Sequence, residues 1–124
     1  MKTWFVSLVL IANCSIVSAE TPPAGVWNAI ESFGGPIYSR WTFQPATGSF
    51  QARWNNGNQA TLKLEAFDPQ RIVVTRYDAN GPTAGLRVRY EGLRSENGYK
   101  GDVTWYWQGR PQRGQWSIEM PPEE

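Results

Sequence analysis

The sequence predicts an all-β protein whose eight antiparallel strands follow one another up and down and close into a small barrel. Three observations support this fold class. Runs of about six to nine residues are rich in β-branched and aromatic side chains, and short turn sequences separate them. Within most runs, apolar and polar residues alternate, as in a sheet with one buried face. No stretch shows the apolar stripe of an amphipathic helix.

Turn-forming residues divide the chain into eight expected strands. Asn56-Gly57 and Asn97-Gly98 are typical of hairpins, because both residue types tolerate positive φ. A further turn is expected at Gly109-Arg110-Pro111. Connections this short leave no room for crossover helices, so neighbouring strands should be antiparallel. The expected strands are Gly25–Ser32, Ile37–Gln44, Ser49–Asn55, Gln59–Phe67, Arg71–Tyr77, Gly85–Gly92, Tyr99–Trp107 and Gly114–Met120.

The alternation assigns side chains to two faces. Leu86, Val88 and Tyr90 face one way, for example, and the charged residues between them face the other. Arg76 follows the inward register and would need a carboxylate partner, for which Asp78 and Glu31 are candidates. The acidic residues expected on the outer face are Glu31, Glu65, Glu91 and Asp102.

One apolar face must be hidden from water, and a closed barrel does this without leaving sheet edges. A two-layer β-sandwich is the alternative. The short connections favour the barrel, since a long crossing would be needed for a Greek key, and Asp78–Ala84 is the longest candidate for one.

The first 19 residues have the pattern of a secretory signal peptide. Lys2 provides the positive charge, Trp4–Ala12 is the apolar segment, and Val17-Ser18-Ala19 is a suitable cleavage site. We therefore expect a single domain over residues 20–124, secreted or periplasmic after cleavage near Ala19. Lipid attachment at Cys14 is disfavoured, because Asn13 stands where a small residue is normally required.

Composition narrows the expected chemistry. The chain has no histidine, and its one cysteine lies in the signal segment, so residues 20–124 have no thiol nucleophile and no thiolate metal ligand. Beyond Lys2, basic and acidic residues balance, which does not indicate nucleic-acid binding. No phosphate loop or metal-ligand spacing occurs. We expect no catalytic residues, no metal, no cofactor and no membrane span, and therefore a protein that is not an enzyme.

Six tryptophans beyond the signal segment are the most unusual feature: Trp27, Trp41, Trp54, Trp105, Trp107 and Trp116. They could line a site for a small apolar or aromatic ligand or a flat sugar, because such rings stack on indoles. The expected ligand-binding residues are then Trp41, Trp54, Tyr90, Trp105 and Trp107. Alternatively, the rings fill the barrel completely, which is the favoured interpretation, because an eight-stranded barrel is only just wide enough for one small ligand.

With a filled barrel, function would lie on the surface, in an interaction module for an extracytoplasmic protein or glycan, such as an envelope inhibitor. The expected contact loops are Asp78–Ala84, Leu93–Gly98 and Gln108–Arg113.

Gly25-Val26-Trp27, at the start of the first strand, resembles the Gly-x-Trp signature of calycins, the group that contains lipocalins, fatty-acid-binding proteins and avidins. The resemblance implies an eight-stranded barrel that carries a small ligand. It also implies that Trp27 plugs one end of the barrel, against Arg113 near the last strand. The chain is shorter than a typical lipocalin, lacks the other lipocalin motifs, and lacks the helical lid of fatty-acid-binding proteins. The stretch from Arg76 to Trp105 is also similar to uncharacterised exported bacterial proteins.

Overall fold

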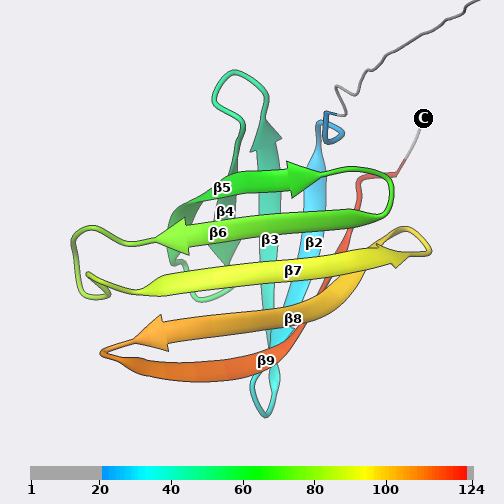
Figure 1. The fold of residues 1–124 in the computed structure, drawn as a ribbon. Coiled ribbons are helices and arrows are strands. Elements are labelled where there is room, and N and C mark those ends of the chain that lie inside the picture. Colours follow the sequence, from blue (N-terminus) through cyan, green and yellow to red (C-terminus); the bar gives the residue numbers. More distant parts are fainter. Residues whose placement is uncertain (1–20, 123–124) are drawn as a thin grey trace, which may run out of the picture.

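The computed structural model describes residues 21–122, which form one closed antiparallel barrel (Figure 1). The fold class predicted from the sequence is confirmed, and the sandwich alternative is wrong. The expected signal segment, with Cys14 and Ala19, lies outside the described residues. Among residues 21–122, no helix is long and apolar enough to cross a membrane.

Each strand pairs with the next along the chain, and β2 pairs with β9 to close the barrel. Figure 1 shows β2 and β3 upright while β6, β7 and β8 lie across them, as expected for a strongly twisted sheet. The strands are β2 (Val26–Ser32), β3 (Pro36–Gln44), β4 (Ser49–Trp54), β5 (Gln59–Phe67), β6 (Arg71–Tyr77), β7 (Arg87–Ser95), β8 (Gly98–Trp107) and β9 (Arg110–Glu119).

The main boundary errors of the sequence prediction lie in β7 and β9. The β7 strand runs to Ser95 rather than Gly92, and β9 begins at Arg110 rather than Gly114. The turn before β9 is Gln108-Gly109, and both residues have positive φ (52° and 78°), as a two-residue hairpin loop requires. Pro111 is tolerated inside β9 because pairing with β2 extends only to Gln115, so this part of β9 has a single neighbour, β8.

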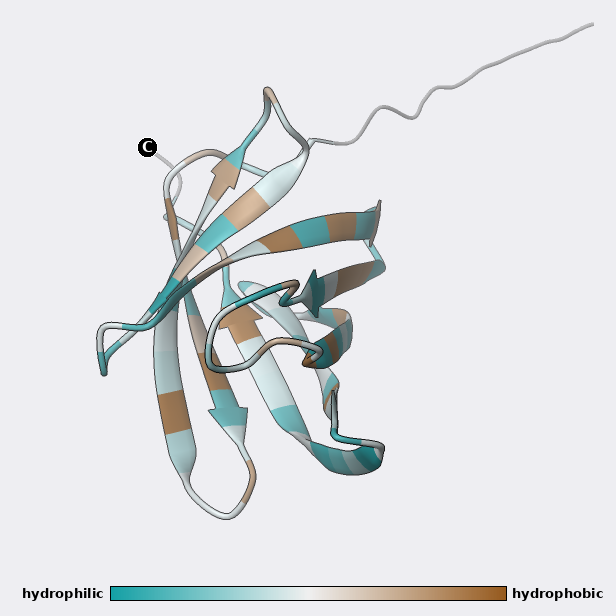
Figure 2. Cartoon of the chain, turned by 90° about the vertical axis from the view of Figure 1, so that its left-hand side faces the viewer, coloured by the Kyte–Doolittle hydropathy of each residue, from teal (hydrophilic) through white to brown (hydrophobic). Residues whose placement is uncertain are grey.

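Aromatic rings fill the middle of the barrel. Trp41 lies at its centre, with ring centroids 5.0 Å from Tyr90, 5.4 Å from Phe50 and 5.6 Å from Trp116. All four side chains are at most 2 % exposed. Figure 2 shows the underlying alternation as hydrophobic and hydrophilic bands along the strands. Direct ring-to-ring contact across the interior confirms close packing in this part of the barrel.

One end of the barrel, where β2 begins and β9 ends, is closed by aromatic side chains; we call it the sealed end. Trp27 is fully buried there and packs edge-on against Phe50 and Phe67. Its indole Nε1 donates to the carbonyl of Pro23 at 2.9 Å, and the Tyr99 hydroxyl donates to the carbonyl of Asp68 at 3.0 Å. Without these two bonds, the indole N–H and the hydroxyl would be buried at the sealed end with no hydrogen-bond partner.

Close approach of β7 and β8 depends on glycine. A Cβ atom at Gly101 would overlap the backbone carbonyl of Glu91, whereas a Cβ at Gly35 would meet nothing. We expect Gly101→Ala to lower the free energy of unfolding by roughly 1–3 kcal/mol, as overpacking does. Gly35→Ala should change it by less than about 0.5 kcal/mol. Urea unfolding of both variants checks this, and equal stabilities would contradict the β7–β8 geometry.

Candidate functional site

The most unusual side chain inside the barrel is Glu31 on β2. The sequence analysis placed it on the outer face, and this is wrong: Glu31 is 0 % exposed. It follows Trp27 and Ala29 on the inward positions of β2. A buried carboxylate is costly unless it is paired or hydrogen-bonded, so its surroundings decide what it can do.

Glu31 is surrounded by hydrogen-bond donors that it only partly uses. The indole Nε1 of Trp54 donates to Glu31 Oε2 at 3.1 Å. Within residues 21–122, however, Glu31 Oε1, the Tyr90 hydroxyl and Trp105 Nε1 are buried without a hydrogen-bond partner. Each such atom costs about 1–3 kcal/mol relative to one that is paired. These atoms come from β2, β7 and β8, so three separate strands bring unsatisfied polar groups to one place.

Burial raises the pKa of Glu31 above its ordinary value of 4.5. The hydrogen bond from Trp54, the nearby donors of Trp105 and Tyr90, and the positive charge of Arg76 act in the opposite direction without cancelling it. Trp105 and Tyr90 therefore lie close enough to Glu31 to favour its charged form, although neither meets the geometry of a hydrogen bond with it. Burial, followed by the charge of Glu31, also raises the pKa of Tyr90, so its hydroxyl stays protonated.

An ion pair lies beside Glu31. Arg76 on β6 donates from Nε to Asp78 Oδ1 at 3.0 Å and from an Nη atom to Asp78 Oδ2 at 2.9 Å, and its guanidinium carbon lies 4.9 Å from the centre of the Trp54 ring. The expected inward orientation of Arg76 is thus confirmed, and of its two candidate partners Asp78 makes the ion pair. Partial burial raises the pKa of Asp78, but hydrogen bonds from Arg76 and Thr83 and the Arg76 charge lower it below its ordinary value.

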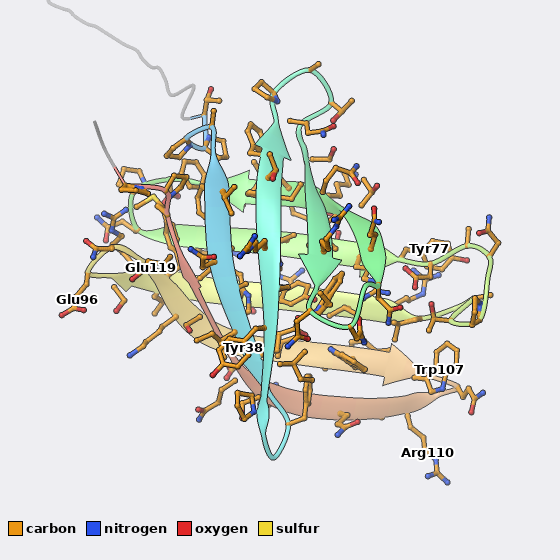
Figure 3. All side chains as sticks on the ribbon, turned by 180° about the vertical axis from the view of Figure 1, so that it is seen from behind. Tyr38, Tyr77, Glu96, Trp107, Arg110 and Glu119 are labelled. Carbon is orange, nitrogen blue, oxygen red and sulfur yellow. The ribbon has the colours of Figure 1, made fainter. Side chains whose placement is uncertain are left out.

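These groups lie toward the end of the barrel opposite the sealed end, which we call the polar end. It carries the β6–β7 connection and the β8–β9 hairpin, which reach out on the same side in Figure 1. Figure 3 shows Tyr77, Trp107 and Arg110 together on this side. Phe33, Trp105 and Trp107 are half-buried here, and the Phe33 and Trp105 ring centroids are 4.9 Å apart. The polar end therefore combines accessible aromatic rings with buried polar atoms.

The structure brings together some, but not all, of the residues predicted to bind a ligand. Trp54, Tyr90 and Trp105 surround Glu31, and Trp107 lies farther out on β8. Trp41 lies deeper, in the packed centre. Sequence reasoning missed Glu31 as a site residue, although the alternation Trp27, Ala29, Glu31 was the signal that could have found it.

Trp27 and Arg113 are not brought together. Trp27 lies at the start of β2 and Arg113 near the start of β9. Because the two strands are antiparallel, these positions are at opposite ends of the barrel, and Arg113 is exposed. Trp27 closes the sealed end with apolar rings instead.

A hollow lies on the outside of the barrel, across β4, β3, β2, β9 and β8; we call it the outer groove. Its volume is about 830 Å³. Figure 3 labels three of the residues that line it: Tyr38, Glu96 and Glu119. Ion pairs among the described residues involve Arg71, Arg76 and Arg89, and leave the three cations of the groove without a carboxylate partner: Arg40, Arg53 and Lys100. The predicted loop Leu93–Gly98 contributes to one wall.

Comparison with known proteins gives no match to a family model, a curated protein or a solved structure. The case for function therefore depends on the geometry of the two sites.

The raised pKa of Glu31 leads to a pH prediction. Between the ordinary value of 4.5 and the raised folded value, the folded state binds more protons than the unfolded state. The free energy of unfolding should therefore fall as the pH rises through this window. In Glu31→Gln this loss is absent, so the stability of the variant relative to the wild type should increase with pH and then level off.

Urea unfolding of both proteins between pH 3.5 and about pH 8 measures the difference. A difference that stays constant over this range would mean that Glu31 is not buried as described. A difference that decreases with pH would mean that the native state favours the charged carboxylate.

Proposed function

We propose that this chain is an exported, non-enzymatic binding protein that takes a small ligand at the polar end of its barrel. One observation carries the proposal: Glu31 Oε1, the Tyr90 hydroxyl and Trp105 Nε1 are buried and unpaired beside half-buried aromatic rings. Native proteins leave few buried polar atoms unsatisfied. Ligand sites combine apolar walls with a few convergent polar groups, which is the composition found here.

The calycin resemblance supports the same end of the barrel. An up-and-down barrel of eight strands is compatible with that group, and Trp27 lies in the sealed end, as the Gly-x-Trp resemblance implies. A ligand would then enter from the opposite end, where Glu31 lies. Export rests on the signal pattern in residues 1–19, and we propose that the mature protein acts in the periplasm or outside the cell.

Binding rather than catalysis fits the side chains at this end. Glu31 is surrounded by two indoles and a phenol, and the nearby Arg76 is held by Asp78. These groups stack and hydrogen-bond, and no histidine is present in the chain to relay a proton. The proposal accordingly includes no cofactor, no metal and no chemical step.

Two neighbouring residues of β8 provide a matched test. Trp107 is half-buried at the polar end, whereas Tyr106 is 48 % exposed on the outer face. For any small molecule found by a thermal-shift screen, we expect Trp107→Ala to weaken binding about tenfold or more, because an aromatic wall is lost. Tyr106→Ala should leave the affinity unchanged. Titration of tryptophan fluorescence measures both.

Loss of binding in Tyr106→Ala alone would place the ligand on the outside of the barrel and contradict the proposal. Equal binding by both variants and the wild type would also contradict it.

A surface interaction module is the second candidate function, and the outer groove is the observation that favours it. About 830 Å³ is enough for several rings of a glycan or a short peptide segment. Its exposed surface includes Tyr38 and Ile30, together with the three cations that have no carboxylate partner. A partner with both apolar and anionic groups would fit this surface, as in other interfaces that place aromatic and arginine side chains together.

Two outward residues of β3 separate this candidate from the first. Arg40 lines the groove, and Thr42 lies farther along the same strand, outside it. If the groove binds a partner, Arg40→Ala should lower recovery of an envelope protein or glycan in affinity capture by about tenfold, and Thr42→Ala should not. Recovery that is the same with both variants would exclude the groove as the contact surface.

A further inference from the structure

The unpaired atoms at the polar end indicate which hydrogen-bonding groups a ligand must carry. Glu31 Oε1 is an acceptor when the carboxylate is charged, Trp105 Nε1 is a donor only, and the Tyr90 hydroxyl can be either. Glu31 and Tyr90 are both 0 % exposed. A ligand that satisfies all three must therefore present donors and acceptors close together.

Charges at the same end disfavour ions. A cationic ligand attracted by Glu31 would approach Arg76, whose charge acts on both Glu31 and Tyr90. An anionic ligand attracted by Arg76 would approach Glu31 and Asp78. Arg76 already has its counter-ion in Asp78, with which it makes two hydrogen bonds, so it is not available as a free anion site. Because both signs of charge are present, a ligand of either sign would be repelled by one of these groups, and only a neutral ligand avoids this.

The aromatic walls define the shape of the ligand. Trp105 and Phe33 meet edge to face, with Trp107 half-buried farther along β8. Flat faces of indole accept the C–H face of a ring, while its N–H remains available at the edge. A hydroxyl group on such a ring can donate to Glu31 Oε1 and accept from Trp105 Nε1 at the same time.

We propose that the polar end binds a neutral ring that carries several hydroxyl groups, such as one sugar unit of a neutral glycan. This rests on the proposed function, since it assigns a ligand class to the same site. The aromatic rings hold the face of the sugar, and the buried carboxylate, phenol and indole pair with its hydroxyl groups.

A set of related sugars tests the ligand class. Glucose and N-acetylglucosamine are neutral, glucosamine is a cation at neutral pH, and glucuronate is an anion. We expect at least one neutral sugar to quench tryptophan fluorescence and to bind about tenfold more tightly than both charged sugars. Tighter binding of a charged sugar, or no binding by any of them, would overturn the inference. The ligand screen with Trp107→Ala decides separately whether the site itself exists.

Tyr90→Phe distinguishes a ligand-binding hydroxyl from a structural one. The substitution removes only the hydroxyl, which has no partner within residues 21–122, so Tm should stay the same or rise. Affinity for the neutral sugar should nevertheless fall about tenfold, because the hydroxyl pairs with the ligand. Trp105→Phe, which keeps an aromatic ring and removes the Nε1 donor, should lower the sugar affinity to a similar extent.

Glu65→Gln is the matched control for an acidic residue on the outside, since Glu65 is exposed and accepts a hydrogen bond from Thr75 at 2.7 Å. Its sugar affinity should equal that of the wild type. A lower Tm in Tyr90→Phe with unchanged sugar affinity would overturn the inference, because the hydroxyl would then be part of the core only.

Discussion

Pairing between β2 and β9 is the contact that turns the sheet into a barrel, and it is short. Asn28–Ser32 face Gln115–Glu119, while the rest of β9 continues past the end of β2. Gly114 permits this arrangement, because a Cβ there would overlap the carbonyl of Ser32 and crowd the ring of Phe33. Phe33 can therefore follow β2 and reach Trp105. The offset pairing of β2 with β9 thus both closes the barrel and places accessible aromatic rings at the polar end.

The same closure determines how the interior is filled. Eight strands enclose a space only wide enough for side chains or one small ligand, and this chain has no disulfide within residues 21–122 to stabilise it. Trp41, Trp116 and Tyr90 occupy the middle in mutual contact, and Trp27 closes the sealed end. Aromatic packing accordingly confines any internal ligand to the polar end, whichever molecule it is.

Most of the fold could be predicted because the local signals agree with one another. Alternation correctly assigned Leu86, Val88 and Tyr90 to one buried face, and the short connections correctly indicated an up-and-down barrel. The start of β9 could not be predicted in the same way. Pro111 is a strong turn signal. A strand is possible there only because this part of β9 has one neighbouring strand and not two, which is a property of the tertiary structure.

The site was less predictable for a different reason. Charged residues are almost never fully buried, so the residue type of Glu31 favoured the surface while its position on β2 favoured the interior, and position decided the outcome. Arg76 had the same conflict, but its place in the register predicted its inward orientation, and Asp78 was one of the two candidate partners. The outer groove had no sequence signal, because its residues come from five strands (β2, β3, β4, β8 and β9) and neighbouring loops, and only the pairing register brings them together.

The conflict at Glu31, between a residue type that prefers the surface and a buried position, bears on function. A carboxylate at Glu31 raises the free energy of the native state, as the upward shift of its pKa indicates, and an apolar residue of similar size would avoid this cost. The aromatic core next to it can tolerate the cost, since each buried ring contributes several times the stability of an ordinary hydrogen bond. Natural sequences tend to keep such locally unfavourable residues where they are needed for function. The packing that limits space inside the barrel is therefore also what permits an unsatisfied polar cluster to persist at one end of it.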